Sequence, residues 1–346
     1  MPVNAGGLPV AVAFSGGKDS TAAVLLLREQ GHDVRALTMR LGLAGEDDKL
    51  ARIGNLARVL QLPWDVVDVR DAFKKKVLEH FVQAYPRGLT PNPCVQCNRH
   101  IKFGLLPAVL EKNAPGSLFA TGHYAAKACS EGRWFLSEPA DRGKSQIYFL
   151  AMIDPPVLQK VLFPIAGLSI AAVRAKVAGL PLANSKESQD ICFLQGEDLA
   201  AFLQRHAPDG FAAGDFLDTN GNKIGRHNGA LHFTVGQRRG TGHASDRRLY
   251  VVARDAAANT VTLGDEGDLR TGSLAAALPV YWRPLQAGEE LAVKVRYGLH
   301  AHAATITEAG ADRVRAIFKK PVRAVTPGQL AVFYDGDIIV AAGEIV

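Results

Sequence analysis

With 346 residues, the chain is long enough for two or three domains of roughly 150 residues each. Hydrophobic residues make up 47% and charged residues 21%, a balance that excludes wholesale disorder. The longest apolar runs, such as residues 24–27, fall far short of the ~20 residues that span a bilayer. Composition therefore predicts a globular protein with no membrane association.

The formal net charge is +6, with a pI of about 9.1. This excess suits a polyanionic partner such as RNA, although many proteins with the same balance bind no nucleic acid. The first residues show neither a charged nor an apolar signal region, so we expect a cytoplasmic protein. Four cysteines are too few for a disulfide scaffold and are more typical of metal ligands, catalytic groups or core.

Up to about residue 207, β-rich runs alternate with helix-like stretches. This alternation predicts right-handed βαβ units around a parallel sheet covered on both faces, with ligands bound beyond the carboxyl ends of the strands. The expected strands cover residues 10–14, 34–39, 64–69 and 118–121, and the expected helices cover residues 21–30, 47–62 and 72–85.

After about residue 207 the pattern becomes one of short strands. Asn220-Gly221 between residues 216–218 and 223–224 predicts a tight hairpin, because this dipeptide tolerates positive φ angles. Regular strand spacing from residue 291 onward predicts a small antiparallel barrel. The expected strands are residues 249–253, 260–263, 292–297, 304–306, 313–318, 331–334 and 338–340.

The segment Ser15-Gly16-Gly17-Lys18-Asp19-Ser20 lies between the first strand and the first helix. Its glycines allow close approach to a ligand, and the free N–H groups of the helix start favour an anion such as pyrophosphate. It is not a Walker A loop, which needs four residues between its glycines. Asp19 would repel phosphate unless Mg²⁺ lay between them. The alternative is a glycine turn that merely caps a helix.

The Ser-Gly-Gly-x-Asp-Ser pattern after a buried strand resembles the PP-loop superfamily, whose members cleave ATP between its α and β phosphates and adenylate a carbonyl oxygen. The resemblance implies ATP with Mg²⁺ as cofactor. It implies that the nucleotide is bound by Ala13, Phe14, Ser15, Gly16, Gly17, Lys18, Asp19, Ser20, Met39 and Gly122.

A second motif is the segment Thr90-Pro91-Asn92-Pro93-Cys94-Val95-Gln96-Cys97-Asn98-Arg99-His100-Ile101-Lys102-Phe103. Two prolines predict a stiff exposed loop, and the short spacing brings two thiols within reach of each other. The neighbouring basic residues would favour thiolate over thiol. The alternatives are a redox pair and half of a zinc ribbon, but the chain has no second closely spaced cysteine pair.

A third motif, Ser185-Lys186-Glu187-Ser188-Gln189-Asp190-Ile191-Cys192-Phe193, contains the last cysteine. Taken alone, Cys192 would be interpreted as a buried structural thiol. Its polar approach and the upstream Cys-x-x-Cys favour a chemical role. Cys129 lies in a predicted polar turn over residues 128–132 and matches no motif.

The second and third motifs resemble the tRNA-specific 2-thiouridylases. Further matching segments run in the same order along nearly the whole chain: residues 120–124, 145–150, 233–240, 295–297 and 325–329. The resemblance implies an α/β parallel-sheet PP-loop domain over residues 1–207, a small central β domain over 208–275 and a tRNA-binding β-barrel over 276–346.

The resemblance also implies a reaction and a set of residues. In that reaction the C2 carbonyl of the wobble uridine is adenylated, and AMP and pyrophosphate are released. A persulfide on Cys192 delivers the sulfur. Cys97 assists, either by attacking the persulfide or by forming a disulfide with Cys192. The implied partners are the tRNA anticodon loop and a persulfide-carrying donor protein. The implied catalytic residues are Cys97, Cys192 and Asp19, and the implied tRNA or target-base contacts are Asn92, Pro93, Cys94, His123, Lys144, Ser145, Gln146, Arg296, Tyr297 and Gln329.

Alternatives remain at this stage. A 4Fe–4S cluster held by Cys94, Cys97 and Cys192 would deliver sulfide in place of the persulfide. A PP-loop ligase or amidotransferase on another substrate would not need the paired thiols, and a non-catalytic RNA-binding module would not need the Ser15–Ser20 loop. The chain also departs from the family pattern at Lys18, at Ser145 and in the short stretch of residues 41–46, while many members carry Asp where Cys94 stands.

Overall fold

The computed structural model describes residues 7–183, 191–298 and 300–346. The chain forms two compact units that are interleaved in sequence. The first contains residues 1–76, 94–189 and 337–339, and the second contains residues 77–93, 190–336 and 340–346. Neither unit is therefore one continuous stretch of chain, and the predicted cuts at 207 and 275 both fall within the second unit.

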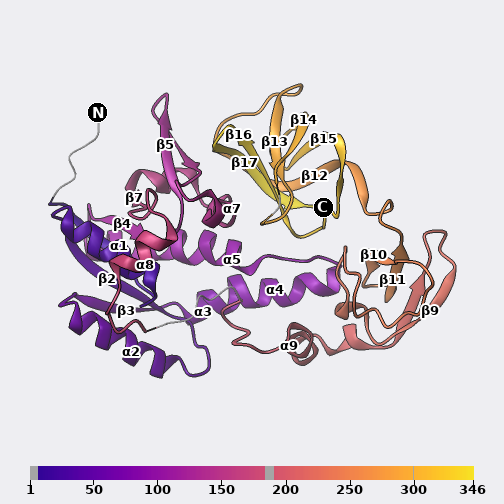
Figure 1. Cartoon of the computed structure of the whole chain (residues 1–346), viewed down its shortest axis with the longest axis horizontal. Coiled ribbons are helices and arrows are strands. Elements are labelled where there is room, and N and C mark those ends of the chain that lie inside the picture. Colours follow the sequence, from indigo (N-terminus) through magenta and orange to yellow (C-terminus); the bar gives the residue numbers. More distant parts are fainter. Residues whose placement is uncertain (1–6, 184–190, 299) are drawn as a thin grey trace. The chain divides into compact units, whose positions relative to one another are not determined.

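The first unit is built on a parallel sheet of five strands in the order β3-β2-β1-β4-β7 (Figure 1). This confirms the predicted parallel sheet, and the unpredicted β7 is too short to show a periodic pattern. The order reverses direction between β1 and β4, which marks the switch point where open α/β sheets bind ligands. The strands are β1 (Pro9–Ala13), β2 (Asp33–Arg40), β3 (Trp64–Asp68), β4 (Leu118–Thr121) and β7 (Val161–Leu162).

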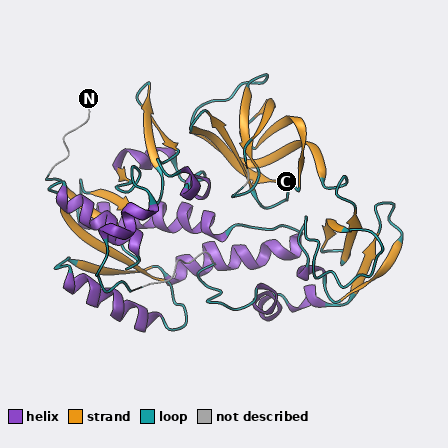
Figure 2. Ribbon diagram, viewed as in Figure 1, coloured by secondary structure: helices purple, strands orange, loops and turns teal. Residues whose placement is uncertain are grey.

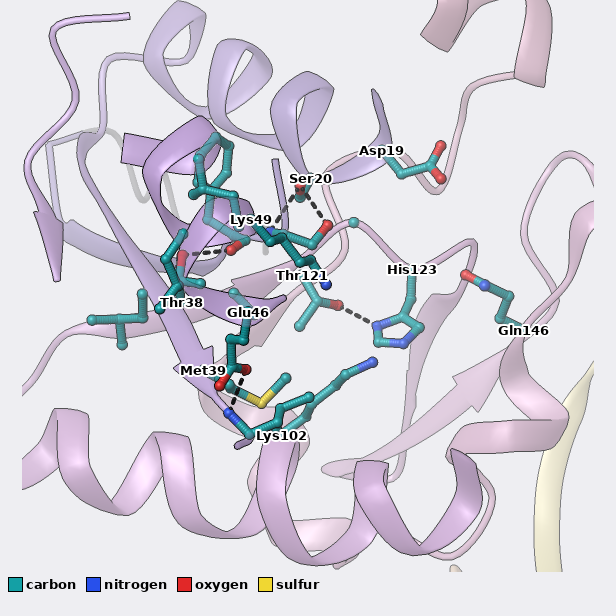
Figure 3. Close-up of a pocket in the computed structure, with 18 residues that line it drawn as sticks. Asp19, Ser20, Thr38, Met39, Glu46, Lys49, Lys102, Thr121, His123 and Gln146 are labelled. Atoms are coloured by element: carbon teal, nitrogen blue, oxygen red, sulfur yellow. Dashed lines mark hydrogen bonds between the residues drawn. The ribbon is translucent and has the colours of Figure 1, made fainter. Parts of the chain in front are cut away.

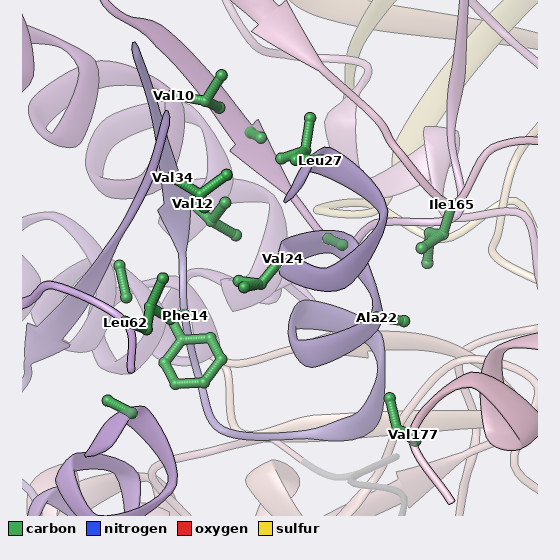
Figure 4. Close-up of a cluster of buried hydrophobic side chains, with 14 of the residues drawn as sticks. Val10, Val12, Phe14, Ala22, Val24, Leu27, Val34, Leu62, Ile165 and Val177 are labelled. Atoms are coloured by element: carbon green, nitrogen blue, oxygen red, sulfur yellow. The ribbon is translucent and has the colours of Figure 1, made fainter. Parts of the chain in front are cut away.

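Both faces of this sheet are covered, as predicted. On one face, Val24 and Leu27 of helix α1 (Lys18–Glu29) join a buried cluster with Val10 and Val12 of β1 (Figure 4). Neighbouring residues of a strand point to opposite faces. Phe119 of β4 accordingly meets the ring of Phe103 on the other face, with ring centres 6.0 Å apart. Together the two layers fix the carboxyl ends of the strands.

The helices, drawn in purple in Figure 2, begin and end near the predicted positions, and one of them differs from the prediction in type. The predicted helix over residues 72–85 is three consecutive segments, and a similar π-helical stretch follows the Cys-x-x-Cys motif. The α-helices are α1, α2 (Glu46–Val59), α3 (Arg70–Phe73), α4 (Glu79–Ala84), α5 (Pro93–Gln96), α6 (Leu106–Asn113), α7 (Ile147–Leu150), α8 (Ile170–Lys176) and α9 (Leu199–His206), and the π-helical segments are Lys74–Leu78 and Cys97–Leu105. The 3₁₀ turns are Tyr85–Arg87, Arg142–Lys144, Pro155–Lys160, Pro208–Phe211 and Ala230–His232.

A hairpin not predicted from the sequence follows β4. Its strands are β5 (Ala126–Ser130) and β6 (Arg133–Ser137), and Cys129 pairs with Trp134 across it. The prediction that Cys129 lies in a turn is therefore wrong. The turn is confined to residues 131–132, where both φ angles are positive.

The second unit contains a four-stranded sheet in the order β10-β11-β8-β9. The predicted hairpin at Asn220-Gly221 is confirmed: Gly221 has φ of 84°, and Asp218 accepts hydrogen bonds from the main-chain nitrogens of Asn220 and Asn222. The strands are β8 (Gly214–Leu217), β9 (Lys223–His227), β10 (Tyr250–Asp255) and β11 (Thr260–Gly264).

The same unit contains almost all of the predicted antiparallel barrel. Six strands follow the order β12-β15-β14-β13-β16-β17, and pairing of β12 with β17 closes the ring. The alanine-rich β12 was not predicted, because residues 274–278 lack the β-branched alternation of a strand. The strands are β12 (Arg270–Tyr281), β13 (Glu290–Lys294), β14 (His302–Ala309), β15 (Arg313–Arg323), β16 (Leu330–Asp335) and β17 (Ile338–Ile345). In the described part of the chain, no helix is both long and apolar enough to cross a bilayer.

Candidate functional site

The Ser15–Ser20 loop forms a compact turn between β1 and α1. Ser20 Oγ lies 3.2 Å from Ser15 Oγ and donates to the Gly17 carbonyl at 3.1 Å. Gly16 has φ of 69°, a conformation that favours glycine. The loop thus holds its two serines and the start of α1 in one arrangement at the carboxyl end of β1.

Gly122, directly after β4, packs against this loop. A Cβ built on Gly122 would lie 2.5 Å from the carbonyl carbon of Asp19 and 2.6 Å from the nitrogen of Ser20. Only a glycine therefore allows the end of β4 to approach the loop this closely. The predicted grouping of Gly122 with the loop has a steric basis in the switch point between β1 and β4.

Asp19 and Lys18 form an ion pair at the start of α1. Lys18 Nζ lies 2.9 Å from Oδ2 of Asp19, and their side chains are 18% and 31% exposed. Oδ1 of Asp19 is buried without a hydrogen-bond partner among the described residues. The carboxylate therefore keeps one buried oxygen available for a cation, as the predicted magnesium site requires.

A cavity of about 210 Å³ opens beside the loop, at the ends of β1, β2 and β4 (Figure 3). It brings together many of the predicted residues, whereas Gly16, Gly17 and Lys18 do not line it. The predicted residues on its wall are Ala13, Phe14, Ser15, Asp19, Ser20, Met39, Gly122, His123 and Gln146. The wall also contains Leu37, Thr38, Leu41, Glu46, Lys49, Leu50, Ile53, Lys102 and Thr121, which sequence reasoning did not assign to the nucleotide site.

Thr38 shows how the unassigned residues shape the cavity. Its hydroxyl donates to the Phe14 carbonyl at 2.7 Å and accepts from the Trp64 indole at 2.8 Å, so it joins the ends of three strands. Glu46 accepts from the main-chain nitrogens of Leu41 and Gly42 at 2.6 and 2.7 Å and fixes the stretch after β2. The position of Thr38 at a strand's carboxyl end was the signal that could have identified it.

A histidine and a lysine lie on the opposite wall. His123 lies 2.9 Å from the Thr121 hydroxyl through Nδ1, and Lys102 extends toward it from the Cys97–Leu105 segment (Figure 3). Burial lowers the pKa of His123 well below its ordinary value, and the positive charge of Lys102 lowers it further. The histidine is therefore neutral near pH 7, and Lys102 is a cation available to a phosphate or a developing oxyanion.

The Cys-x-x-Cys motif is helical rather than a loop. Helix α5 begins at Pro93, so Cys94 and Cys97 are three residues apart and lie on neighbouring positions of one helical face. Cys97 is buried and Cys94 reaches the surface. Protein atoms crowded around Cys94 displace water and raise its pKa, and Lys102 counters this only in part. Lys102 therefore acts in the predicted direction, toward the thiolate, but its effect is smaller than that of burial.

Cys192 belongs to the second unit, whereas Cys94 and Cys97 belong to the first. It is exposed, and the adjacent Phe193 is buried against Phe81, with ring centres 5.2 Å apart. Exposure of the thiol contradicts the alternative of a buried structural cysteine. The rest of the third motif, residues 185–190, lies outside the described residues. Within residues 7–183, 191–298 and 300–346, no three metal-ligating side chains cluster together.

The predicted RNA contacts are distributed over both units. In the first, Gln146 accepts from the Tyr124 nitrogen at 2.9 Å, Lys144 ends a 3₁₀ turn, and Ser145 is buried. In the second, Arg296 donates to the Thr326 hydroxyl at 3.2 Å. Asn92 and Pro93, directly before Cys94, also belong to the second unit. So does Tyr297, which is 44% exposed. The last of these predicted contacts, Gln329, donates through its amide to the Thr90 carbonyl at 2.7 Å.

Comparison with known proteins matches the chain along almost its full length. Family models match as the tRNA methyl transferase HUP domain over residues 8–196, the tRNA methyl transferase PRC-barrel domain over 200–265 and the aminomethyltransferase beta-barrel domain over 273–345.

Three curated relatives have similar lengths. The tRNA-specific 2-thiouridylase MnmA of Acidithiobacillus ferrooxidans is 39% identical over 342 residues, covering 96% of this chain and 97% of that protein. The MnmA of Desulforudis audaxviator is 40% identical over 342 residues, covering 97% and 98%. MnmA 1 of Caldanaerobacter subterraneus subsp. tengcongensis is 39% identical over 356 residues, covering 97% of each. The resemblance noted in the sequence is confirmed, and the chain belongs to the tRNA-specific 2-thiouridylase family.

Proposed function

We propose that this chain is an ATP-dependent tRNA 2-thiouridylase that replaces the C2 oxygen of the wobble uridine with sulfur. The observation that carries the proposal is the cavity at the switch point of the parallel sheet, walled by the Ser15–Ser20 loop, in a chain of this family. Oxygen at C2 is a poor leaving group, and adenylation converts it to one that departs as AMP. Lys102 on the opposite wall supplies positive charge for the phosphate.

The residues present fit a magnesium ion. The buried Oδ1 of Asp19 lacks a hydrogen-bond partner in the described chain, and hard carboxylate oxygens are the ligands that Mg²⁺ prefers. When bound, the ion would neutralise charge on the phosphates. Ser15 and Ser20 would then orient the pyrophosphate through their hydroxyls and the N–H groups at the start of α1.

Sulfur transfer is assigned to Cys192 and Cys97. The terminal sulfur of a Cys192 persulfide attacks C2 and expels AMP, leaving a disulfide between Cys192 and the base. Cys97 then attacks the Cys192 sulfur, which releases 2-thiouridine and forms a Cys97–Cys192 disulfide. The two thiols supply the two electrons that reduce the sulfane sulfur, and an external thiol must reduce the disulfide before the next turnover. The exposure of Cys192 supports its loading by a persulfide-carrying protein.

The tRNA must present a single base to the cavity. Unstacking a loop base costs a few kcal/mol, which contacts to phosphates and stacking offset. In the second unit, Arg296 offers a cation for a phosphate, and the exposed Tyr297 offers an aromatic ring on which a base can stack. Anticodon-loop recognition follows from this proposal.

The test is mass spectrometry of nucleosides from tRNA incubated with the enzyme, ATP, Mg²⁺ and a persulfide donor. The expected product has oxygen exchanged for sulfur, with one AMP and one pyrophosphate released. Asp19→Asn should abolish both, while Asp33→Asn, at the exposed start of β2, should not. ATP-independent thiolation would remove the role of the loop.

A further inference from the structure

The short segment before the Cys-x-x-Cys motif is held by side chains from two different strand groups of the second unit. Arg254 of β10 donates through Nη2 to the carbonyl of Leu89 at 2.9 Å and to that of Tyr85 at 3.4 Å. Gln329, next to β16 of the barrel, donates through Nε2 to the Thr90 carbonyl at 2.7 Å. Two successive carbonyls, those of Leu89 and Thr90, are thus each bound by a different side chain.

The turn before Gln329 binds the same residue a second time. The Thr90 nitrogen donates to the Pro327 carbonyl at 2.8 Å. Gly328 has φ of 87°, and a Cβ built on it would lie 2.6 Å from that nitrogen. Both main-chain polar groups of Thr90 are therefore fixed by the turn, which only a glycine allows to come this close.

The guanidinium of Arg254 is committed to main-chain carbonyls. It also donates to the Phe233 carbonyl at 3.1 Å and stacks 5.5 Å from the ring centre of Tyr85. Burial lowers the pKa of Arg254. A half-buried guanidinium makes directional, charge-assisted hydrogen bonds, which hold their acceptors more firmly than bonds from neutral donors do.

A predicted RNA contact is joined to the same turn. Arg296 donates to the hydroxyl of Thr326, which is 1% exposed and donates in turn to the Ala324 carbonyl at 2.9 Å. Thr326 immediately precedes Pro327. A phosphate that binds Arg296 would therefore compete for its hydrogen bond to Thr326. Thr326 is the neighbour of Pro327, whose carbonyl accepts the hydrogen bond from Thr90.

We propose that Arg254 and Gln329 are positioning residues that fix Thr90 and thereby set the path of the Pro91–Cys97 segment. Pro91 and Pro93 each lock one φ angle, and each also restricts the residue before it, so a displacement of Thr90 passes along the segment with little room to relax. The inference rests on the proposed function, since the positioned segment contains the thiol assigned to sulfur transfer. It changes the role of Gln329 from an RNA contact to a support of that segment.

The experiment uses the full-length protein and the variants Gln329→Met, Arg254→Lys and, as a matched control, Gln204→Met on the exposed face of α9. Methionine keeps the length of glutamine but has no donor, and lysine keeps the charge but loses the fork that reaches two carbonyls. Hydrogen exchange of the free protein is followed in peptides from residues 85–97, β1 and β16. Single-turnover thiolation at saturating tRNA and tRNA affinity are measured in parallel.

The expected result is faster exchange confined to residues 85–97 in Gln329→Met and Arg254→Lys, with unchanged tRNA affinity. The single-turnover rate should fall about fivefold or more, the factor for one hydrogen bond. Gln204→Met should match the wild type. Weaker tRNA binding with unchanged exchange would overturn the proposal and restore Gln329 as an RNA contact. Faster exchange with an unchanged rate would also overturn it. If the wild type fails to thiolate tRNA, the proposed function is wrong. The positioning role of Arg254 and Gln329 is judged separately, because unchanged exchange at residues 85–97 in both variants would overturn it.

Discussion

Gly122 and Ser20 are in such close contact that a single added carbon would separate them. The Cβ of an alanine at position 122 would lie 2.6 Å from the Ser20 nitrogen, a distance that requires one of the two backbones to move. Because both segments end at the switch point of the sheet, their contact defines one wall of the cavity. The conformation of the Ser15–Ser20 loop therefore depends on a residue about one hundred positions away in sequence.

Gly122→Ala should reduce ATP affinity by about tenfold or more, because relieving such overpacking costs about 1–3 kcal/mol and moves the N–H groups of the loop. Calorimetric titration with ATP measures the effect. Gly167→Ala is the matched control, since a Cβ there meets nothing within 4 Å. Wild-type ATP affinity in Gly122→Ala would show that the loop does not bind the phosphates.

Lys18→Met should change the magnesium requirement of adenylation. Lys18 competes with a cation for Asp19, and an ion pair at this exposure contributes up to about 1 kcal/mol. Its removal should lower the Mg²⁺ concentration for half-maximal pyrophosphate release by up to about fivefold, whereas the KM for ATP should rise through loss of positive charge. Lys49→Met removes a basic residue that lines the cavity but keeps the Lys18–Asp19 pair, so the KM for ATP should rise while the magnesium midpoint stays unchanged. An unchanged magnesium midpoint in Lys18→Met would exclude Asp19 as the metal ligand.

His227 should make folding stability depend on pH. Burial lowers its pKa below the ordinary value of 6.5, and its Nδ1 accepts the Gly229 N–H at 3.1 Å, an acceptor that protonation would remove. The unfolded chain therefore takes up a proton before the folded chain does. Stability should be fully present above about pH 6.5 and fall as the pH drops toward the folded pKa, by up to about 1.4 kcal/mol per pH unit for this group.

Urea unfolding between pH 5 and 7.5 measures this slope. His227→Asn keeps an acceptor for Gly229 but has no titrating group, so its stability should depend less steeply on pH even if its absolute value is lower. His80 and His123, whose pKa values are also lowered by burial, would leave a residual slope. An identical slope in the variant would assign the pH dependence to those other groups.

The fold was predictable where periodicity is long and regular. Strands β1, β2 and β4 are rich in apolar and β-branched residues, so the sheet and its ligand-binding edge followed from the sequence. Strand β12 could not be predicted in this way, because alanine has a low preference for strands and gives no alternating pattern. The helical start at Pro93 was also missed, since two prolines read as a loop although proline suits the first turn of a helix.

The site was predictable in part, because motifs report residues that lie next to each other in sequence. Lys102 was noted only as a neighbour of the cysteines, yet it lines the cavity beside the Ser15–Ser20 loop. Gln329 was assigned to RNA, yet it bonds to Thr90 across 239 positions of sequence. Such long-range contacts depend on how strands pair in the folded unit, and no local pattern records them.

The cysteines distinguish two routes for sulfur. In the persulfide route Cys97 and Cys192 carry out the chemistry, so Cys97→Ala and Cys192→Ala should abolish thiolation in air with a persulfide donor. Cys94→Ala should retain measurable activity. The reason is that Cys97 and Cys192 together supply both electrons in that route, so Cys94 takes no part in its electron balance. Cys129→Ala, an exposed cysteine on β5, is the matched control and should match the wild type.

The iron–sulfur route predicts a different set of results from the same variants. Three cysteine thiolates would be ligands, so each of the substitutions at Cys94, Cys97 and Cys192 should reduce both iron content and activity. Protein purified without oxygen would then be brown, with broad absorption near roughly 400 nm, which is typical of thiolate-bound iron–sulfur centres. Iron analysis and absorption spectra of the wild type and the Cys94→Ala variant decide between the routes. An oxygen-sensitive enzyme whose activity follows iron content and is lost in Cys94→Ala would overturn the persulfide mechanism, because Cys94 has no role in the electron balance of that reaction.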